Sequence, residues 1–342
     1  MVAIGFQEHL PISSANSFQK YTVLVPKIGK HDLLVRVNGV SVNPVDTFVR
    51  GGGRKGMLKQ PKIIGWDAVG IVEEIGAEVT LFNKGDRVYY AGEFNRQGSD
   101  AQYQAVDERI VGHAPKTLDD SDAAGIPLTA LTAYESLFEQ LPISLTDKTK
   151  NTDKTILIIN GAGGVGSLAV QMAHHAGLKV IATASRPDTE AWVRKMGADE
   201  VVNHRNDLVK EVHGLGIKFV DYILNLKDLD GHWKEIAQLI KPQGYVAATT
   251  ENHRGIDLQQ LTKKMVTFAW EWMYSKAYYK TTNMVTQHEI LEKVAQWLNN
   301  GTLQSTVTKK YDQITSHNLQ QAHADVESGH MIGKVTLYGE WQ

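Results

Sequence analysis

A glycine-rich turn in the middle of the chain carries the clearest chemical pattern, that of a site for a dinucleotide pyrophosphate. Its glycines have separate steric reasons: Gly161 permits a tight exit from a strand, Gly163 lets the pyrophosphate approach bare backbone, and Gly166 lets the following helix press against the sheet. The phosphates would then lie at the positive end of that helix. We predict that the whole turn contacts the cofactor: Gly161, Ala162, Gly163, Gly164, Val165 and Gly166.

The segments on either side of the turn distinguish a nucleotide site from an ordinary loop, because glycine-rich turns also punctuate loops. A β-branched run at 155–160 precedes the turn, apolar residues at helical spacing follow it from 165 to 176, and Gly177 supplies a stop. The run at 179–184 is typical of a second buried strand. Together these segments form a complete βαβ unit, which favours nucleotide binding.

The end of that second strand indicates which nicotinamide cofactor is bound. Enzymes that use NAD usually hold the adenosine ribose with an Asp or Glu about 20 residues after the glycines. Here Ser185 and Arg186 stand in that place, and the first carboxylate, Asp188, follows Pro187. A hydroxyl and a guanidinium would bind a 2′-phosphate that a carboxylate would repel. We predict a preference for NADPH; the alternative is that Arg186 is an ordinary exposed loop arginine.

Length and composition limit the classes of function that are open to the chain. Its 342 residues favour two domains, and its formal net charge of -2, without a dense Lys/Arg block, makes nucleic acid and anionic membranes poor partners. It contains no cysteine, which excludes disulfides and thiolate chemistry. No basic, apolar leader opens it and no run reaches the roughly 18 apolar residues of a membrane helix, so we expect a cytoplasmic protein.

Two patterns of secondary structure divide the sequence. Short β segments separated by Gly and Pro fill residues 5–111. The predicted strands of this region are 21–25, 32–37, 69–75 and 87–90. From residue 155 strands alternate with helices, as in a parallel sheet covered on both faces, and a final β run follows at 333–338. We predict an α/β fold with an antiparallel β domain over 1–122 and 284–342 and a doubly wound dinucleotide-binding domain over 123–283.

Motifs spread over nearly the whole chain carry a family resemblance. They are Val42-Asn43-Pro44-Val45-Asp46-Thr47, Gly65-Trp66-Asp67-Ala68-Val69-Gly70, Gly85-Asp86-Arg87-Val88, Leu131-Thr132-Ala133-Tyr134, the glycine turn, Gly197-Ala198-Asp199 and Gly333-Lys334-Val335. As a set they resemble the medium-chain dehydrogenase/reductase superfamily, in its zinc-lacking quinone oxidoreductase branch. The resemblance implies a Rossmann domain and a GroES-like β domain that carries the catalytic groups.

Other motifs resemble one subfamily of that branch, often labelled zinc-type alcohol dehydrogenase-like. They are Tyr90-Ala91-Gly92, residues 106–112 and Trp270-Glu271-Trp272-Met273. The zinc in that label conflicts with the residues. Zinc members carry a cysteine where Asn43 stands, a Gly-His-Glu motif at Gly65-Trp66-Asp67, and another cysteine near Leu128. Because zinc needs three or four converging N, S or O ligands, we predict no catalytic zinc.

The resemblance also implies further cofactor contacts. Thr132 matches a threonine near the nicotinamide ribose, and His204 stands where related reductases have a tyrosine that lines the phosphate pocket. Lys334, in the Gly-Lys-Val motif, is another expected cofactor contact. The family also implies a homodimer, often joined through the edges of the nucleotide-domain sheets.

A site without a metal restricts the hydride acceptor. Hydrogen bonds suffice to stabilise a delocalised enolate or hydroquinone, so a quinone or a carbonyl-conjugated alkene (an enone or enal) suits such a site better than a simple aldehyde. Candidate catalytic residues are Asn43 as an amide donor, Asp46 as the carboxyl that orients it or a water, and Tyr90 as a phenol. Packing and turn capping are alternative roles for Tyr90 and Asp46. Alternative functions are an NADPH-binding protein with little turnover and an alcohol dehydrogenase-like carbonyl reductase.

Overall fold

The computed structural model describes residues 1–53, 56–250 and 252–342. Over these residues the chain divides into two compact units. Unit 1 joins Met1–Leu131 to Tyr274–Gln342, and unit 2 is Thr132–Met273. Unit 1 is therefore built from both ends of the chain, with unit 2 inserted between them.

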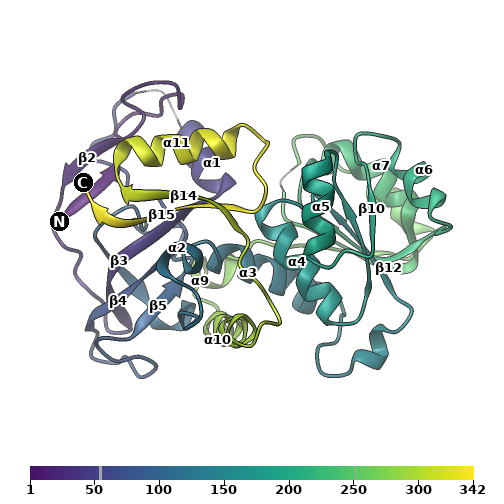
Figure 1. Cartoon of the computed structure of the whole chain (residues 1–342), viewed down its shortest axis with the longest axis horizontal. Helices are drawn as coiled ribbons and strands as arrows, with labels where there is room; N and C mark the ends of the chain where they lie inside the picture. The colour runs from purple at the N-terminus through teal and green to yellow at the C-terminus, as the bar shows by residue number, and fades with distance from the viewer. Residues whose placement is uncertain (54–55, 251) are drawn as a thin grey trace. The chain divides into compact units, whose positions relative to one another are not determined.

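A mainly antiparallel sheet forms the centre of unit 1 (Figure 1). The strands described in this unit are β1 (Val2–Gly5), β2 (Gln19–Thr22), β3 (Asp32–Val42), β4 (Ala68–Ile75), β5 (Arg87–Tyr90), β6 (Tyr103–Asp107), β7 (Val111–His113), β14 (Val307–Ile314) and β15 (Lys334–Trp341). The large sheet has the order β14-β15-β3-β4-β5-β7, and β6 also pairs with β3. Only β14 and β15 pair in parallel within it, over the described residues.

Helices cover the unit 1 sheet. Those described are α1 (Pro44–Gly51), α2 (Asp120–Ala123), the beginning of α3 (Pro127–Glu135), α9 (Ser275–Tyr278), α10 (Thr286–Asn299) and α11 (Ser316–Glu327), with a 3₁₀ turn at Glu108–Ile110. Figure 1 shows α11 lying along β14 and β15, which it contacts. On the other side of the unit, α10 packs against β7.

Two strands of unit 1 differ from the sequence prediction in a way that matters for the site. The predicted strand at 21–25 is wrong in its bounds, because β2 ends at Thr22. The strand predicted at 32–37 continues to Val42, so that β3 delivers Asn43 at its end. Because β15 pairs antiparallel with β3, with Val335 opposite Val42, the beginning of β15 reaches the same place.

A parallel sheet forms the centre of unit 2 (Figure 1). Its described strands are β8 (Thr155–Ile159), β9 (Lys179–Thr183), β10 (Glu200–Val202), β11 (Val220–Asn225), β12 (Ile240–Ala248) and β13 (Thr267–Trp270). Their order, β10-β9-β8-β11-β12-β13, is the 3-2-1-4-5-6 order of a Rossmann sheet. Together with the antiparallel sheet of unit 1, this order confirms the predicted fold class.

Helices and apolar strands form the buried core of unit 2. The described helices are the end of α3, α4 (Gly164–His175), α5 (Pro187–Lys195), α6 (Leu208–Gly214), α7 (Leu229–Leu239) and α8 (Gln259–Thr262), with a π-helical turn at Ser136–Gln140 and a 3₁₀ turn at Lys148–Asn151. Strand residues such as Leu157, Ile181 and Ile223 are fully buried beside Trp233 of α7. Sheet strands with both faces covered need such continuous apolar runs.

No described helix is both long enough and apolar enough to cross a membrane.

Candidate functional site

The predicted cofactor turn of unit 2 joins β8 to α4. Asn160 takes the left-handed conformation at the exit from the strand, with φ of 70°. Gly161 is required for another reason: a Cβ there would lie 2.8 Å from the Cβ of Ala182 on β9. A Cβ at Gly166 would lie 2.3 Å from the carbonyl oxygen of Asn160. Both glycines therefore let the turn and helix pack directly on the sheet, as the pattern predicts for Gly166.

Backbone N–H groups gather at the beginning of α4. Gly163 is the residue before the helix, and Gly164, Val165 and Gly166 make its first turn. The first N–H groups of a helix have no partner within it, and the helix dipole is positive there. Ser167 closes the turn, since its N–H and its Oγ both bond to the Gly163 carbonyl at 2.8 and 2.7 Å. The geometry suits an anion such as a pyrophosphate.

Polar side chains gather at the end of β9. Thr183 Oγ1 accepts a hydrogen bond from the Asn160 N–H at 2.9 Å and lies 3.1 Å from Nδ1 of His204. Burial, followed by the nearby His232 and Arg205, lowers the pKa of His204. The imidazole is therefore neutral at neutral pH and would offer a hydrogen bond, not a charge, to a phosphate.

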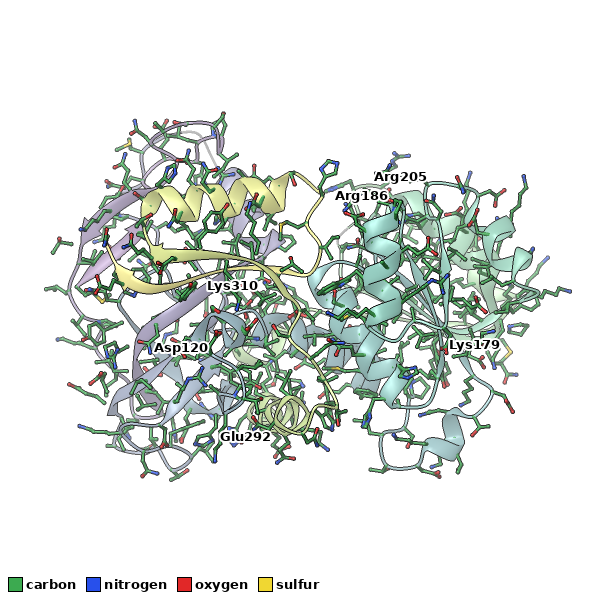
Figure 2. The ribbon with its side chains drawn as sticks, in the orientation of Figure 1. Asp120, Lys179, Arg186, Arg205, Glu292 and Lys310 are labelled. Carbon is green, nitrogen blue, oxygen red and sulfur yellow. The ribbon has the colours of Figure 1, made fainter. Side chains whose placement is uncertain are left out.

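Ser185 and Arg186 line a cavity of about 310 Å³ at this end of the sheet. In Figure 2, Lys179 marks the beginning of β9. Arg186 lies far from Lys179, past the other end of that strand. Arg186 forms an ion pair with the exposed Asp188, Nε to Oδ1 at 3.1 Å. The cavity walls also include Glu190. Its carboxylate is paired with Arg194, at 3.1 Å.

In unit 1, a buried polar cluster forms where β3 ends and β15 begins. The Nζ of Lys334 donates to the Asn43 Oδ1, to the Asp67 Oδ2 at 3.1 Å and to the Val42 carbonyl at 3.1 Å. Asn43 Nδ2 donates to Asp67 Oδ2 at 2.8 Å, and Leu128 N–H donates to Asp67 Oδ1 at 2.8 Å. The Lys334 and Asp67 side chains are 3 % and 0 % exposed, so these bonds replace water entirely.

Local sequence explains how Asn43 and Asp46 are held in this cluster. Asn43 lies in extended backbone before α1, and Pro44 begins the helix, where a missing N–H costs nothing. Asp46, in the first turn, accepts a hydrogen bond from the Asn43 N–H at 2.7 Å. The other oxygen of Asp46, Oδ1, is buried without a hydrogen-bond partner among the described residues.

Burial dominates the titration of the carboxyl groups in this region. It raises the pKa of Asp46 to about 7, although the Asn43 N–H and the Lys334 ammonium oppose the rise. Burial also raises the pKa of Asp67, again against Lys334 and the Leu128 N–H. The pKa of buried Asp100 is raised by burial and by the Asp46 charge. Asp46 is therefore poised to exchange a proton near neutral pH.

The structure brings together only some of the predicted residues. Asn43, Asp46 and Lys334 share the unit 1 cluster, whereas the glycine turn, Ser185, Arg186 and His204 belong to unit 2. Thr132 is a buried residue of α3 in unit 2. Tyr90 is buried on β5, its hydroxyl has no hydrogen-bond partner among the described residues, and burial raises its pKa.

Asp67 is the site residue that the sequence prediction missed. The motif Gly65-Trp66-Asp67 singled out its position, as the place of an absent metal ligand, but gave no role to the carboxylate. Its partner Lys334 lies 267 residues further along the chain. The pairing of β15 with β3, together with that of β3 with β4, which Asp67 directly precedes, brings them into contact.

The residues at the positions of the missing zinc ligands do not fit a zinc ion. A ligand must direct a lone pair at the metal. Here the Asn43 oxygen accepts from Lys334, and both oxygens of Asp67 accept N–H bonds. Within residues 1–53, 56–250 and 252–342, no group of three or more His, Cys, Asp or Glu side chains is arranged to hold a metal.

Comparison with known proteins places this fold and site in a class. Residues 29–117 match the family model for the alcohol dehydrogenase GroES-like domain, and residues 164–287 match the model for zinc-binding dehydrogenases. A zinc-type alcohol dehydrogenase-like protein of Staphylococcus aureus (strain MSSA476) is 42 % identical over 98 % of this chain and 99 % of its own length. The chain therefore belongs to the medium-chain dehydrogenase/reductase superfamily and is an oxidoreductase of that superfamily.

Two further relatives bear on the site. The NADPH-dependent alkenal/one oxidoreductase of Arabidopsis thaliana, a chloroplast protein, is 30 % identical over 92 % of this chain and 74 % of its own length. A crystal structure from Rhizobium etli CFN 42, provisionally named a zinc-dependent alcohol dehydrogenase protein, has 40 % identity and a TM-score of 0.93. It covers 100 % of this chain and 99 % of that one.

Proposed function

We propose that this protein is an NADPH-dependent reductase that transfers hydride to a quinone or a carbonyl-conjugated alkene without a metal ion. The observation that carries the proposal is the end of β9, where a serine and an arginine line a cavity at the position at which an acidic residue would select NAD. The name of the Arabidopsis relative, an NADPH-dependent alkenal/one oxidoreductase, supports both the cofactor and the acceptor.

The cofactor contacts follow from unit 2. Within the turn Gly161–Gly166, the N–H groups of Gly164, Val165 and Gly166 would hold the pyrophosphate, because those of Gly161 and Gly163 bond to the Thr183 and Asn160 carbonyls. Ser185 and Arg186 would hold the 2′-phosphate, and neutral His204 would donate a hydrogen bond nearby. Thr132 remains the predicted contact near the nicotinamide. Contact of Lys334 with the cofactor also stays a prediction, and its Nζ hydrogen bonds in the structure point to Asn43, Asp67 and Val42.

Reduction of a conjugated acceptor needs a proton as well as a hydride. When NADPH is bound it supplies the hydride; the enolate or hydroquinone anion that results must then be stabilised and protonated. Asp46 is the best candidate for an acid that acts directly or through water, because its Oδ1 is unpartnered among the described residues and its pKa is about 7. Asn43 is a weaker candidate donor, since its amide hydrogens face Asp67 and the Trp66 carbonyl.

A substrate panel tests the proposal. NADPH oxidation by the purified protein is followed with quinones, enones and enals, and with simple aldehydes as the control class. Faster turnover of conjugated acceptors, and with NADPH over NADH, is the expected result. Tight NADPH binding without turnover of any acceptor would support the alternative of a binding protein, and turnover of simple aldehydes alone would support the carbonyl reductase.

Assembly and location complete the proposal. We expect a homodimer joined through an edge of the unit 2 sheet, whose edge strands over the described residues are β10 and β13. Light scattering coupled to size exclusion measures this directly, and a mass near that of one 37.9 kDa chain would contradict it. A cytoplasmic location is the corresponding expectation for the cell.

A further inference from the structure

Lys334 places a full positive charge deep inside unit 1. The chain can enter β15 at this residue only because Gly333 precedes it: Gly333 has φ of 58°, and a Cβ there would lie 2.0 Å from the Thr306 carbonyl oxygen. The Lys334 N–H bonds to that same carbonyl at 2.9 Å. The backbone thus fixes where the side chain starts, and the side chain runs inward to Asp67.

We propose that the ammonium of Lys334 is the resident cation of this pocket, a built-in substitute for a divalent metal ion, and that it acts as a positioning residue for Asn43. A buried carboxylate such as Asp67 needs a counter-charge, because an unpaired charge in an apolar interior is strongly destabilising. Lys334 supplies one that is attached to the chain itself. An external cation could bind here only by displacing the Lys334 ammonium.

The arrangement of hydrogen bonds shows why metal and ammonium exclude each other here. Asp67 Oδ2 accepts from Lys334 and from Asn43, while its Oδ1 accepts from the Leu128 N–H. Asn43 Oδ1 accepts from Lys334. The oxygen atoms that could ligate a metal thus already accept hydrogen bonds from donors that the fold holds in place, so that a metal ion would have to compete with these N–H groups for the same oxygens.

The same bonds set the orientation of the Asn43 amide. Because Lys334 is a donor only, it must face the amide oxygen, which turns Nδ2 toward Asp67 and the Trp66 carbonyl at 3.4 Å. Asn43 is also the residue whose N–H bonds to Asp46. Lys334 therefore positions the side-chain amide of Asn43, a role distinct from direct contact with a cofactor.

Lys310 offers a matched control for the Lys334 substitution. It lies on β14, the strand beside β15, and is labelled in Figure 2. Its Nζ bonds to Asp122 at 2.8 Å, but its side chain is 36 % exposed, so that water can replace the pairing. Loss of the Lys310 charge should have little consequence, in contrast to loss of the Lys334 charge.

The first arm of the test uses the wild-type protein and zinc alone. After equilibrium dialysis against Zn²⁺ and then against metal-free buffer, we expect no stoichiometric zinc by elemental analysis. One zinc per chain, lost in the Asp67→Asn variant, would overturn the proposal. Because this arm needs no Lys334 variant, it decides the matter even if such a variant fails to fold.

The second arm removes the ammonium and replaces it from solution. Lys334→Ala should lose about 5 °C or more in Tm, whereas Lys310→Ala should stay close to wild type. Propylammonium should restore much of the loss, and the neutral 1-propanol should not. Equal effects of the amine and the alcohol, or equal stability of the two variants, would contradict the proposal. Zinc content and Tm are independent of turnover, so failure here and failure of the reductase function are distinguishable.

Discussion

The two candidate regions of this molecule are built by different means. At the cofactor end of unit 2, glycines and the first turn of α4 present backbone N–H groups, and all of these lie within a few consecutive residues. In unit 1 the site is a network of side chains from the residue that follows β3, the segment before β4, and β15, in which Asn43 and Lys334 are 291 residues apart. A site made of backbone is local in sequence, whereas a site made of side chains is assembled only by the fold.

The comparison also concerns how each region depends on water. The cavity lined by Ser185 and Arg186 is open, and its Arg186–Asp188 pair is partly exposed. The Asn43–Asp67–Lys334 cluster is closed, so each of its groups depends on protein partners alone. Substitutions should therefore act mainly on stability in the unit 1 cluster and should affect the cofactor at the glycine turn and cavity of unit 2. Three variants test that division, and a fourth tests its limit.

The largest effect is expected at Asp67. Asp67→Asn removes the carboxylate that faces Lys334 and leaves an ammonium buried beside a neutral amide, which should cost about 3–5 kcal/mol of unfolding free energy. Urea unfolding followed by circular dichroism measures the loss. Glu73→Gln is the control, because Glu73 pairs with Arg36 at the surface and should change stability by about 0.5 kcal/mol or less. Similar losses of stability in both variants would show that the buried pair contributes no more than the surface pair.

Gly166 should give the next largest effect. Gly166→Ala places a Cβ 2.3 Å from the Asn160 carbonyl, so the helix must move off the strand, at a cost of about 1–3 kcal/mol. NADPH affinity should fall roughly tenfold or more, since the first turn of α4 is displaced. Gly214→Ala in α6 is the matched control, because a Cβ there meets nothing within 4 Å. Calorimetric titration that shows equal NADPH affinity for both variants would remove the turn from the cofactor site.

A substitution at Arg186 tests the selection of NADPH over NADH and not the stability of the fold. Arg186→Glu should lower the ratio of kcat/KM for NADPH to that for NADH by roughly 10- to 100-fold, because a carboxylate would repel the 2′-phosphate. Unfolding free energy should hardly change. Arg194→Glu is the control, in the last turn of α5, the helix that Arg186 caps, where Arg194 is paired with Glu190. An unchanged NADPH preference in Arg186→Glu would mean that the arginine is an ordinary loop residue.

Unit 2 also contains a buried acid pair, which limits the contrast with unit 1. Glu271 follows β13, is 4 % exposed and accepts a hydrogen bond from Gln140 at 3.2 Å. Burial, and then the neighbouring Glu135, raises the pKa of Glu271 to about 9. The folded pKa lies above the unfolded one, so the stability that comes from the bound proton is complete below about pH 4.5 and declines as the pH rises toward about 9.

Glu271→Gln should remove this decline. In the wild type, ionisation of the pair lowers the free energy of unfolding by up to about 1.4 kcal/mol per pH unit across that window. The amide of the Glu271→Gln variant carries no proton to lose. Urea unfolding at pH 6 and at pH 8, chosen inside the window, should show a smaller difference in the variant than in the wild type. Equal pH dependence in the two proteins would show that Glu271 is ionised in the folded state.

Sequence alone was sufficient for the elements whose pattern is local. The strand at β8, the glycine turn and α4 follow from a β-branched run, steric rules and helical spacing within about 20 residues. Even there the left-handed residue is Asn160, which the pattern did not indicate, because asparagine and glycine share that conformation. The Lys334–Asp67 bond could not be predicted in this way, since it depends on the registers between β15 and β3 and between β3 and β4.

The central claim, hydride transfer from NADPH to a conjugated acceptor without a metal, has one direct measurement. The protein is dialysed against a chelator and incubated with an enone and NADPH deuterated at C4, in each of its stereoisomers. We predict that deuterium appears on the carbon β to the carbonyl, from one stereoisomer, at the rate of the untreated protein. No transfer from either stereoisomer, or a transfer that chelation abolishes and zinc restores, would contradict the account.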